Sequence, residues 1–398
     1  MPGQPNIYGK QYLMTAGPTP LPPLVSQVMA EPIIYHRAPA FIELYERSLE
    51  RLPKVFGTQN DVLAFAASGS GAMESAVANL VRPGEPAVVA SAGKFGERWS
   101  ELCDAYGART VTVEAPWGEK IDPAAVAAAI DALDSPPAAV FATHSESSTG
   151  VIHDIQAINE AVVARDSILA VDAISGIGAV ELPQDEWGID VVVSGSQKAL
   201  MCPPGLAFAS VSERALERAA ESRAPRYYFD WQRTAAGQRE RPANSPFTPA
   251  VTLWRALDVA LGLIFEEGLD SVFERHALLA RAARAGIEAA GLERFGPDDP
   301  GANVLTAASL PESIDGGAVP KRMRDRYGVT VAGGQGKLKG RIVRIAHCGY
   351  YGAFDIVVAL TALEMTLRDL GHECEPGAAA AAAQGVFAEA GVAPEPVG

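Results

Sequence analysis

Short apolar segments alternate with longer helix-like segments through the first two thirds of the chain. The apolar segments are four or five residues long and rich in Val, Ile and Ala; they are Val62–Ala66, Ala87–Ala90, Ala138–Ala142, Ile168–Val171 and Ile189–Val193. Segments this short and almost uniformly apolar, with Asp190 as the exception, are typical of strands buried on both faces. The pattern therefore predicts a parallel sheet in this part of the chain.

Segments with helical periodicity separate most of these predicted strands. They are Ala72–Val81, Glu97–Tyr106, Pro123–Leu133 and Ile155–Arg165. Strand, helix and strand in this order form βαβ units, in which helices cover a mostly parallel sheet. We therefore expect an α/β fold.

The pattern changes after Lys198. A helix is predicted at 212–221, and two long helices are predicted at Thr252–Glu267 and Leu269–Ala290; between them, residues 222–249 are rich in Pro, Arg and aromatics and are expected to be irregular. The later segments Ala302–Leu310, Ile342–Ala346 and Phe354–Leu370 are typical of strands and helices in a smaller α+β domain.

These changes divide the chain into four parts. We expect an N-terminal arm (1–20), a large domain (21–265), a small C-terminal domain (266–375) and an Ala-rich tail (376–398). The tail contains little that could pack, so we expect it to be flexible, frayed or partly helical.

Composition narrows the class of protein. The 398 residues include 33 Lys and Arg against 48 Asp and Glu, which gives a net charge of −15. This acidic balance argues against a nucleic-acid surface and against a polybasic membrane patch. The N-terminus has no apolar signal segment, no apolar run could span a bilayer, and the four cysteines form no CxxC pair. We expect a reduced cytoplasmic protein without a metal site.

Polar residues follow the predicted strands where ligands bind in open parallel sheets. Ala67–Gly71 follows the first strand and leads into a helix, whose free N–H groups could hold an anion. An ordinary Gly/Ser turn is the competing interpretation. The segment lacks the third glycine of GxGxxG and the lysine of a P-loop, so dinucleotides and nucleoside triphosphates fit poorly.

Three further strand ends carry reactive groups. Thr143–Gly150 is a run of polar or small residues, Asp172 ends a buried strand, and Lys198 closes the segment Ser194–Lys198. Taken singly, these could be a polar loop, a helix cap and a surface lysine. Together, an anion cradle, an acid and an amine match the phosphate, ring nitrogen and aldehyde of pyridoxal phosphate.

The same segments resemble a known family. Thr143–Gly150, Val171–Ser175 and Ser194–Leu200 are similar to motifs of class V aminotransferases, in particular the alanine–glyoxylate and serine–pyruvate (serine–glyoxylate) aminotransferases. The resemblance extends from Gly17–Pro20 to Arg344–Ala346. It implies the fold type I of pyridoxal-phosphate enzymes, with a large domain that binds the cofactor.

The resemblance also implies roles for single residues. Lys198 would form the Schiff base with the cofactor and shuttle the α-proton, and Asp172 would pair with the ring nitrogen. The other residues implied to bind the cofactor are Ser68, Gly69, Ser70 and Gln197 at the phosphate, Ser147 near the ring hydroxyl, and Phe95 stacked on the ring. Phe95 stands where the alanine–glyoxylate enzymes have a tryptophan, which is a departure from the family pattern.

Substrate and subunit contacts complete the implied site. Arg344 would bind the substrate α-carboxylate as a planar fork, and Tyr35–Arg37 and Gly333–Gly336 would line the substrate pocket. Thr248 would reach the phosphate in the neighbouring subunit of a homodimer with shared active sites. Ser245 stands where some relatives have a tyrosine.

Aromatic residues in the predicted irregular segment are candidates for the dimer interface. They are Tyr227, Tyr228, Phe229 and Trp231, of a type enriched at protein interfaces. The alternative is that this segment forms an intramolecular cap over the cleft.

We therefore expect a transaminase that moves an amino group from alanine or serine to a 2-oxo acid such as glyoxylate or pyruvate by a ping-pong mechanism. The main alternative is an aminophosphonate–pyruvate aminotransferase or another class V enzyme. Ser91 and Lys94 satisfy the S-x-x-K motif of penicillin-recognising enzymes, but the sequence lacks S-D-N and K-T-G. Cys348 is a weak candidate for a desulfurase cysteine, because it lacks a Ser/Gly-rich loop.

Overall fold

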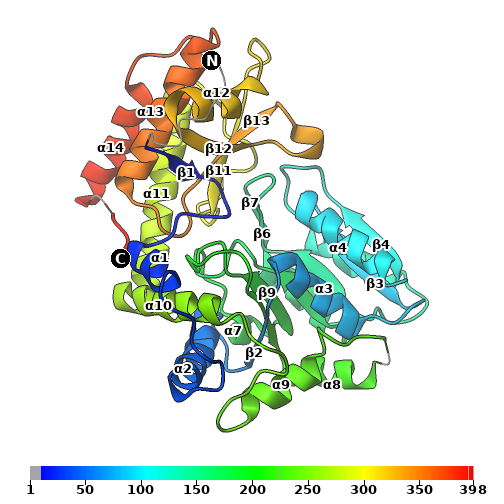
Figure 1. Cartoon of the computed structure of the whole chain (residues 1–398). Coiled ribbons are helices and arrows are strands. Elements are labelled where there is room, and N and C mark those ends of the chain that lie inside the picture. Colours follow the sequence, from blue (N-terminus) through cyan, green and yellow to red (C-terminus); the bar gives the residue numbers. More distant parts are fainter. Residues whose placement is uncertain (1–9, 223, 393, 398) are drawn as a thin grey trace, which may run out of the picture.

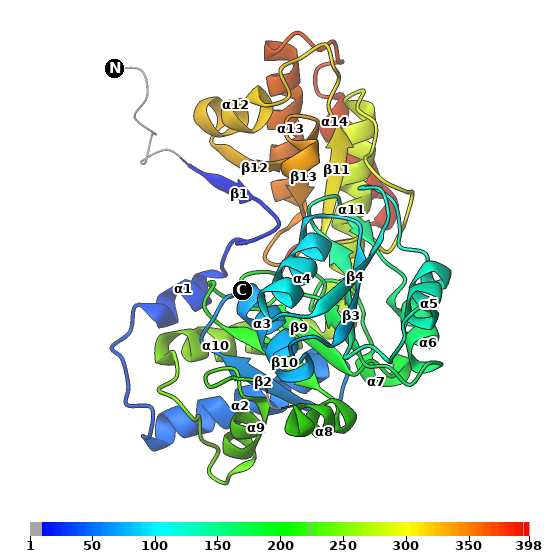
Figure 2. The ribbon, with the colours of Figure 1, turned by 90° about the vertical axis from the view of Figure 1, so that its right-hand side faces the viewer.

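A seven-stranded sheet forms the centre of the larger part of the molecule (Figures 1 and 2). The computed structural model describes residues 10–222, 224–392 and 394–397. In sheet order, the strands are β2 (Asp61–Phe65), β10 (Ala207–Val211), β9 (Val191–Gly195), β8 (Leu169–Asp172), β5 (Val140–Thr143), β3 (Pro86–Ser91) and β4 (Arg109–Glu114). All pairs are parallel except the two that β10 makes with its neighbours. The expected mostly parallel α/β fold is confirmed.

Alternate residues of each strand pack into two different helical layers. Val88 and Val140 face a core with helices α1 (Pro23–Met29), α2 (Pro39–Val55), α5 (Pro123–Asp131), α6 (Ile155–Val163) and α10 (Val251–Glu267). Val89 and Phe141 face the other core, with α3 (Gly69–Leu80), α4 (Lys94–Ala105), α8 (Glu213–Glu221) and α9 (Trp231–Arg239). Both faces of the sheet are covered, which explains why its inner strands are nearly uniformly apolar in sequence, whereas the edge strand β4 is partly exposed and alternates polar and apolar residues.

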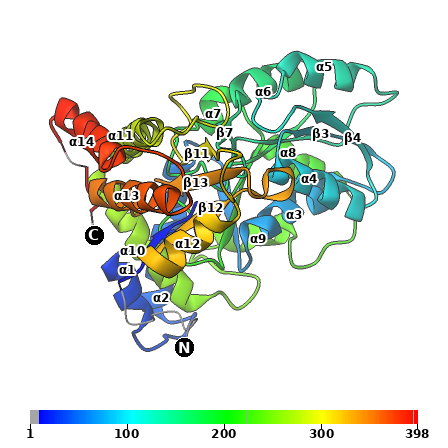
Figure 3. The ribbon, with the colours of Figure 1, turned by 90° about the horizontal axis from the view of Figure 1, so that it is seen from above.

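A four-stranded sheet lies in the smaller part of the molecule (Figure 3). Its order is β1 (Tyr12–Met14), β12 (Val329–Gly333), β13 (Ile342–Ala346) and β11 (Leu305–Ser309). Helices α11 (Leu269–Ala289), α12 (Ala318–Tyr327), α13 (Ala353–Asp369) and α14 (Ala378–Ala390) share its apolar core. Strand β1 belongs to the predicted N-terminal arm, of which residues 1–9 lie outside the described residues. The arm therefore pairs with the small sheet before the chain enters the large one.

Part of the segment predicted to be irregular is the helix α9. Its first residue, Trp231, is completely buried, and its indole Nε1 donates a hydrogen bond to Ser75 Oγ of α3 at 3.1 Å. Trp231 is therefore a core residue, and its prediction as an interface anchor is wrong. The sequence pattern did not show this because α9 has only a short apolar stripe, which its contact with α3 and β2 buries.

The Ala-rich tail packs more firmly than the sequence suggested. Residues 378–390 form α14, which lies against α11 and α13. Ala379, Ala383 and Phe387, spaced four residues apart on one helical face, are buried. Small side chains allow a close approach: a Cβ added to Gly286 of α11 would lie 2.9 Å from the Ala379 carbonyl oxygen. The expected partly helical structure is found at residues 378–390, and the expectation that this part of the tail is flexible or frayed is corrected.

The described residues contain neither a membrane-spanning helix nor a metal-binding cluster, and their cysteines form no disulfide. None of the helices there is long and apolar enough to cross a membrane. The same residues contain no group of three or more His, Cys, Asp or Glu side chains placed to hold a metal ion. All four cysteines are free thiols, and Cys103, Cys202 and Cys348 are buried.

Candidate active site

One cleft brings together most of the residues predicted to bind the cofactor. We call it the central cleft; it is lined by Ser68, Gly69, Ser70, Phe95, Arg98, Ser145, Ser147, Asp172, Ile174, Ser175, Gln197 and Lys198. It lies where β5, β8 and β9 end and α3 begins. Eight of the nine predicted cofactor residues are in this list; the exception is Thr248.

The turn from β2 into α3 forms an anion cradle at one end of the cleft. Ser68 is the N-cap residue of α3, yet its side chain makes no capping hydrogen bond. Close packing explains the glycines here: a Cβ on Gly69 would lie 2.7 Å from Ile174 Cδ1, and one on Gly195 would lie 3.2 Å from the Gly69 backbone. Gln197 Oε1 is buried without a hydrogen-bond partner in the described protein. The free N–H groups at the N-terminus of α3, with the Ser68 hydroxyl and the Gln197 amide N–H as further possible donors, suit a phosphate, whereas the Gln197 oxygen is an acceptor and does not contribute.

Lys198 is buried against the N-terminal arm. Its Nζ donates a hydrogen bond to the carbonyl oxygen of Ala16, and Thr19 Oγ1 donates to the Lys198 carbonyl oxygen at 3.0 Å. Gly17 has a φ of +119°, and a Cβ there would lie 2.4 Å from Nζ, so only glycine fits. Burial lowers the pKa of Lys198, although Cys348 and Asp172 act in the opposite direction. A lowered pKa favours the neutral, nucleophilic amine.

Asp172 is a buried carboxylate at the end of β8. It is 4% exposed, and its Oδ1 accepts a hydrogen bond from the Ile174 N–H at 2.8 Å. Burial raises the pKa of Asp172 to about 7, and the nearby Glu146 raises it further, against the effect of the Ile174 N–H. An ionised carboxylate in this position is costly without a cationic partner. The site therefore favours a ligand that carries a positive charge next to Asp172.

Glu146 positions the helix that carries Phe95. It lies in the hairpin of β6 (Ser145–Glu146) and β7 (Val151–Ile152), and its Oε2 accepts hydrogen bonds from the Phe95 and Gly96 N–H groups at 3.0 and 3.1 Å. Ser148 donates to Oε1 from its N–H and its hydroxyl, at 3.0 and 2.6 Å. A Cβ on Gly93 would lie 2.3 Å from Glu146 Cγ, so α4 begins at a glycine. The carboxylate thus caps α4.

Arg344 lies in β13, beside the central cleft. It is 6% exposed; its Nε and Nη2 donate to the Gly333 carbonyl oxygen at 3.1 and 2.7 Å, and its Nη1 donates to the Ser147 carbonyl oxygen. Burial lowers the pKa of Arg344. Within the described residues this guanidinium forms no ion pair with a carboxylate. A buried cation held only by carbonyl groups is suited to binding an anionic ligand.

Comparison with known proteins identifies the family. Residues 11–346 match the family model described as "Aminotransferase class-V". The chain belongs to the class-V aminotransferases. Members of this family depend on pyridoxal phosphate, and the residues of the central cleft fit that group: the uncapped N-terminus of α3 offers N–H donors for a phosphate, and the buried Asp172 carboxylate can pair with a ring nitrogen.

Individual relatives of this class-V aminotransferase carry different names. It is 42% identical to a Synechococcus sp. (strain PCC 6716) protein named "Soluble hydrogenase, small subunit", over 96% of this chain and 99% of that protein. It is 33% identical to the serine–glyoxylate aminotransferase of Methylorubrum extorquens, over 96% and 97%. The crystal structure of the ureidoglycine–glyoxylate aminotransferase of Bacillus subtilis has a TM-score of 0.90 and 32% identity, over 96% and 98%.

Two residues at or beside the central cleft of this class-V aminotransferase were not predicted from its sequence. Glu146 was part of a predicted polar run but had no assigned role, and Arg98 was not considered. Arg98 lines the central cleft, and its Nη1 donates to Ser70 Oγ at 3.0 Å. The signal that was present is spacing: Arg98 follows Phe95 by three residues, so both lie on one face of α4.

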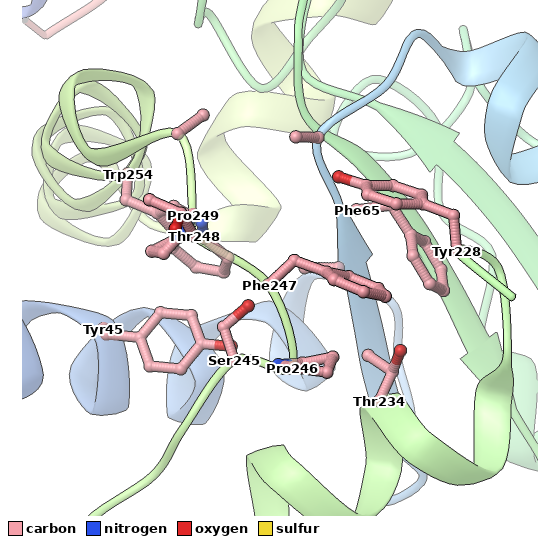
Figure 4. Close-up of a pocket in the computed structure, with 13 residues that line it drawn as sticks. Tyr45, Phe65, Tyr228, Thr234, Ser245, Pro246, Phe247, Thr248, Pro249 and Trp254 are labelled. Atoms are coloured by element: carbon pink, nitrogen blue, oxygen red, sulfur yellow. The ribbon is translucent and has the colours of Figure 1, made fainter.

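Thr248 lies in a separate pocket of the same chain (Figure 4). We call it the aromatic pocket; it is lined by Tyr45, Ala64, Phe65, Ala66, Tyr228, Thr234, Ser245, Pro246, Phe247, Thr248, Pro249, Ala250 and Trp254. Phe247 stacks on Tyr228 with ring centres 4.7 Å apart. Thr248 itself is exposed and does not line the central cleft.

The structure provides no support for the two rival motifs. Ser91 is buried at the end of β3, whereas the S-x-x-K motif needs its serine at a helix start. Lys94 Nζ is engaged by Glu97 and Glu101 at 3.2 and 3.0 Å. Cys348 is completely buried, and burial raises the pKa of its thiol to about 11. A reactive thiolate needs the opposite environment.

Proposed function

We propose that this enzyme moves an amino group from a small L-amino acid, alanine or serine, to a 2-oxo acid such as glyoxylate or pyruvate, in a ping-pong reaction. Pyridoxal phosphate is the proposed cofactor. When bound, it supplies an aldehyde that exchanges amino groups and a ring that withdraws electrons from the carbon being deprotonated. The names of the glyoxylate aminotransferases among the relatives support the acceptor.

The observation that carries this proposal is the arrangement of three groups in the central cleft. A buried amine, Lys198, and a buried carboxylate, Asp172, share the cleft with the uncapped N-terminus of α3. Burying any of these groups without a partner costs free energy. One ligand could satisfy all three: its phosphate at the helix N-terminus, its aldehyde at the amine and its basic ring nitrogen at the carboxylate.

The residues of this chain have separate tasks in the proposed reaction. The neutral Lys198 amine accepts the α-proton of the substrate and returns it, a task for which a lowered pKa is suited. The ionised Asp172 keeps a proton on the ring nitrogen. Arg344 binds the α-carboxylate and so turns the α-proton toward Lys198.

Single amino donors test the proposed function directly. We expect L-alanine or L-serine, added to the holoenzyme without an acceptor, to remove the visible absorbance of the bound cofactor. Glyoxylate or pyruvate should then restore it, as a ping-pong reaction requires. A protein that responded to 2-aminoethylphosphonate and to neither amino acid would be an aminophosphonate aminotransferase instead.

Replacement of Arg344 should weaken substrate binding more than cofactor binding. Arg344→Lys keeps the charge but loses the planar fork that binds both carboxylate oxygens. We expect the KM for the amino donor to rise by about 10- to 100-fold, which corresponds to a loss of one charge-assisted hydrogen bond. Steady-state kinetics measure this effect.

The spectrum of the substrate-free holoenzyme serves as the control for Arg344→Lys. It should match that of the wild type, because among the described residues Arg344 bonds only the backbone carbonyl oxygens of Gly333 and Ser147 and no side chain that lines the central cleft. An altered spectrum with an unchanged KM would show that Arg344 serves the cofactor and not the substrate.

We also propose a two-fold homodimer in which Thr248 of one subunit binds the phosphate of the other. Large apolar side chains are exposed beside Phe247 and in the loop before α2: Tyr227 is 68% exposed and Tyr228 37%, and in the loop Tyr35 is 63% exposed and Ile33 74%. Exposed aromatics of this kind are enriched at interfaces. Thr248→Ala should weaken cofactor affinity by about 3- to 10-fold, the loss of one neutral hydrogen bond, and dilution should release cofactor and activity together.

A threonine away from both pockets provides the matched control for this experiment. Thr361 is exposed on α13 of the small domain, and Thr361→Ala should leave cofactor affinity at the wild-type value. Light scattering at the assay concentration reports the oligomeric state. A fully active monomer would refute the shared active site.

A further inference from the structure

Arg98 is a cation next to the phosphate cradle that the proposed reaction does not use. It projects from α4, and its Nη1 donates a hydrogen bond to Ser70 Oγ at 3.0 Å. The guanidinium carbon lies 4.9 Å from the centre of the Phe95 ring. Within the described residues, none of the ion pairs includes Arg98. Its charge is therefore held in place by a hydroxyl group and an aromatic face, without a carboxylate.

The cradle itself contains only neutral donors. Ser68, Gly69, Ser70 and Gln197 carry no charge, and the N-terminus of α3 supplies only about half a positive charge. The other two basic side chains of the site have different contacts: Lys198 Nζ bonds the arm at Ala16, and Arg344 bonds the carbonyl groups of Gly333 and Ser147. A phosphate in the cradle would thus have Arg98 as its adjacent full positive charge.

We infer that Arg98 is the charge partner of the cofactor phosphate and acts on it through the Ser70 hydroxyl. This inference rests on the proposed function. Arginine has N–H donors and no acceptor, so the hydrogen bond from Nη1 occupies a lone pair of Ser70 Oγ and leaves the hydroxyl proton free. That proton is donated to the phosphate, and the adjacent cation polarises it.

The position of Arg98 depends on the same contacts that position Phe95. Glu146 caps α4 at Phe95 and Gly96, and the Phe95 ring then supports the guanidinium one turn later. A single helix thereby presents an aromatic face to the cofactor ring and a cation toward its phosphate. Arg98 is a positioning and electrostatic residue and takes no part in proton transfer.

A comparison of two ligands tests the inference. Dissociation constants for pyridoxal phosphate and for pyridoxal, which lacks the phosphate, would be measured by absorbance titration of the cofactor-free protein. We expect Arg98→Met to raise the dissociation constant for pyridoxal phosphate by about 10- to 100-fold, which corresponds to the loss of a hydrogen bond to a charged group. Pyridoxal affinity should change by less than about twofold. Arg98→Lys, which keeps the charge, should recover part of the loss.

Two further variants separate the proposed role from a general effect. Lys94→Met removes a cation one turn earlier on α4, where it pairs with Glu97 and Glu101, and should leave both affinities unchanged. Ser70→Ala combined with Arg98→Met should cost less than the sum of the single changes, because the two residues act together. Thermal unfolding of each cofactor-free variant checks the fold.

Three results would overturn the inference. Equal losses for both ligands would show that Arg98 acts on the cofactor ring or on the fold. Unchanged affinity for pyridoxal phosphate, with a raised KM for a substrate carboxylate, would assign Arg98 to the substrate. If the wild-type protein bound neither ligand, the proposed function would fail and the inference would fail with it.

Discussion

The Lys198→Ala variant should fold and yet lose transamination almost completely. Lys198 is the buried amine of the central cleft, and alanine can neither attach to an aldehyde nor carry the α-proton. A positioned general base alone contributes roughly 10²- to 10⁴-fold to a rate, so we expect turnover to fall by at least about 10³-fold. Single-turnover kinetics with L-alanine or L-serine would measure the loss.

A folding control is needed because Lys198 also holds the N-terminal arm. Its Nζ donates to the Ala16 carbonyl oxygen, and its own carbonyl oxygen accepts from Thr19. Circular dichroism and thermal unfolding should show a folded variant, since the Thr19 contact uses the backbone and survives the substitution. An added small primary amine should restore part of the activity. Near-wild-type turnover without such an amine would remove Lys198 from its proposed role.

Asp172→Asn should lower the transamination rate by about 10²- to 10⁴-fold. The substitution keeps an oxygen that can accept the hydrogen bond from the Ile174 N–H, but it removes the charge that keeps the ring nitrogen protonated. Without that proton, negative charge at the substrate α-carbon is less well stabilised by the ring. The measurement is the rate of absorbance change in the amino-donor half-reaction. A loss of only two- or threefold would leave Asp172 with the structural role of holding the turn at Ile174.

Although Asp172→Asn should slow the reaction, it should make the cofactor-free protein more stable to heat. The pKa of Asp172 is about 7 in the fold, against 3.8 for an ordinary aspartate. Between these values the folded protein retains a proton that the unfolded chain has lost, so stability falls as pH rises and the cost is complete above pH 7. Asparagine avoids this cost. We expect its melting temperature to exceed that of the wild type by at least about 2 °C at pH 8, and by less at pH 5.

The central cleft could be predicted largely from the sequence. Asp172 and Lys198 follow short apolar runs, and such runs are typical of buried parallel strands. Strands β5, β8 and β9 are neighbours in the sheet, and parallel neighbours end at the same edge. The residues after them therefore had to meet, as Asp172 and Lys198 do in the central cleft; the roles of the other predicted cofactor residues there were implied by the family resemblance.

Local pattern failed where burial comes from docking between distant segments. Trp231 lies in a segment rich in Pro and Arg, and its burial depends on α3, more than 150 residues earlier in the chain. The alanines of α14 resemble a low-complexity tail in sequence. They are buried only because α11 and α13 present a matching close-packed face, with Gly286 at the contact. Neither result follows from residue type alone.

The sequence by itself determined the fold class and the chemistry at the strand ends, because hydrophobic periodicity specifies which residues of an element are buried. It did not determine which polar groups hold that chemistry in place. The Ala16 carbonyl at Lys198, Glu146 at the N-terminus of α4 and Arg98 at Ser70 are contacts between groups 182, 51 and 28 residues apart. A buried donor or acceptor must find a partner, and any element of the right geometry can supply one. Only the tertiary packing of the arm, the hairpin and α4 around the cleft decided which element did.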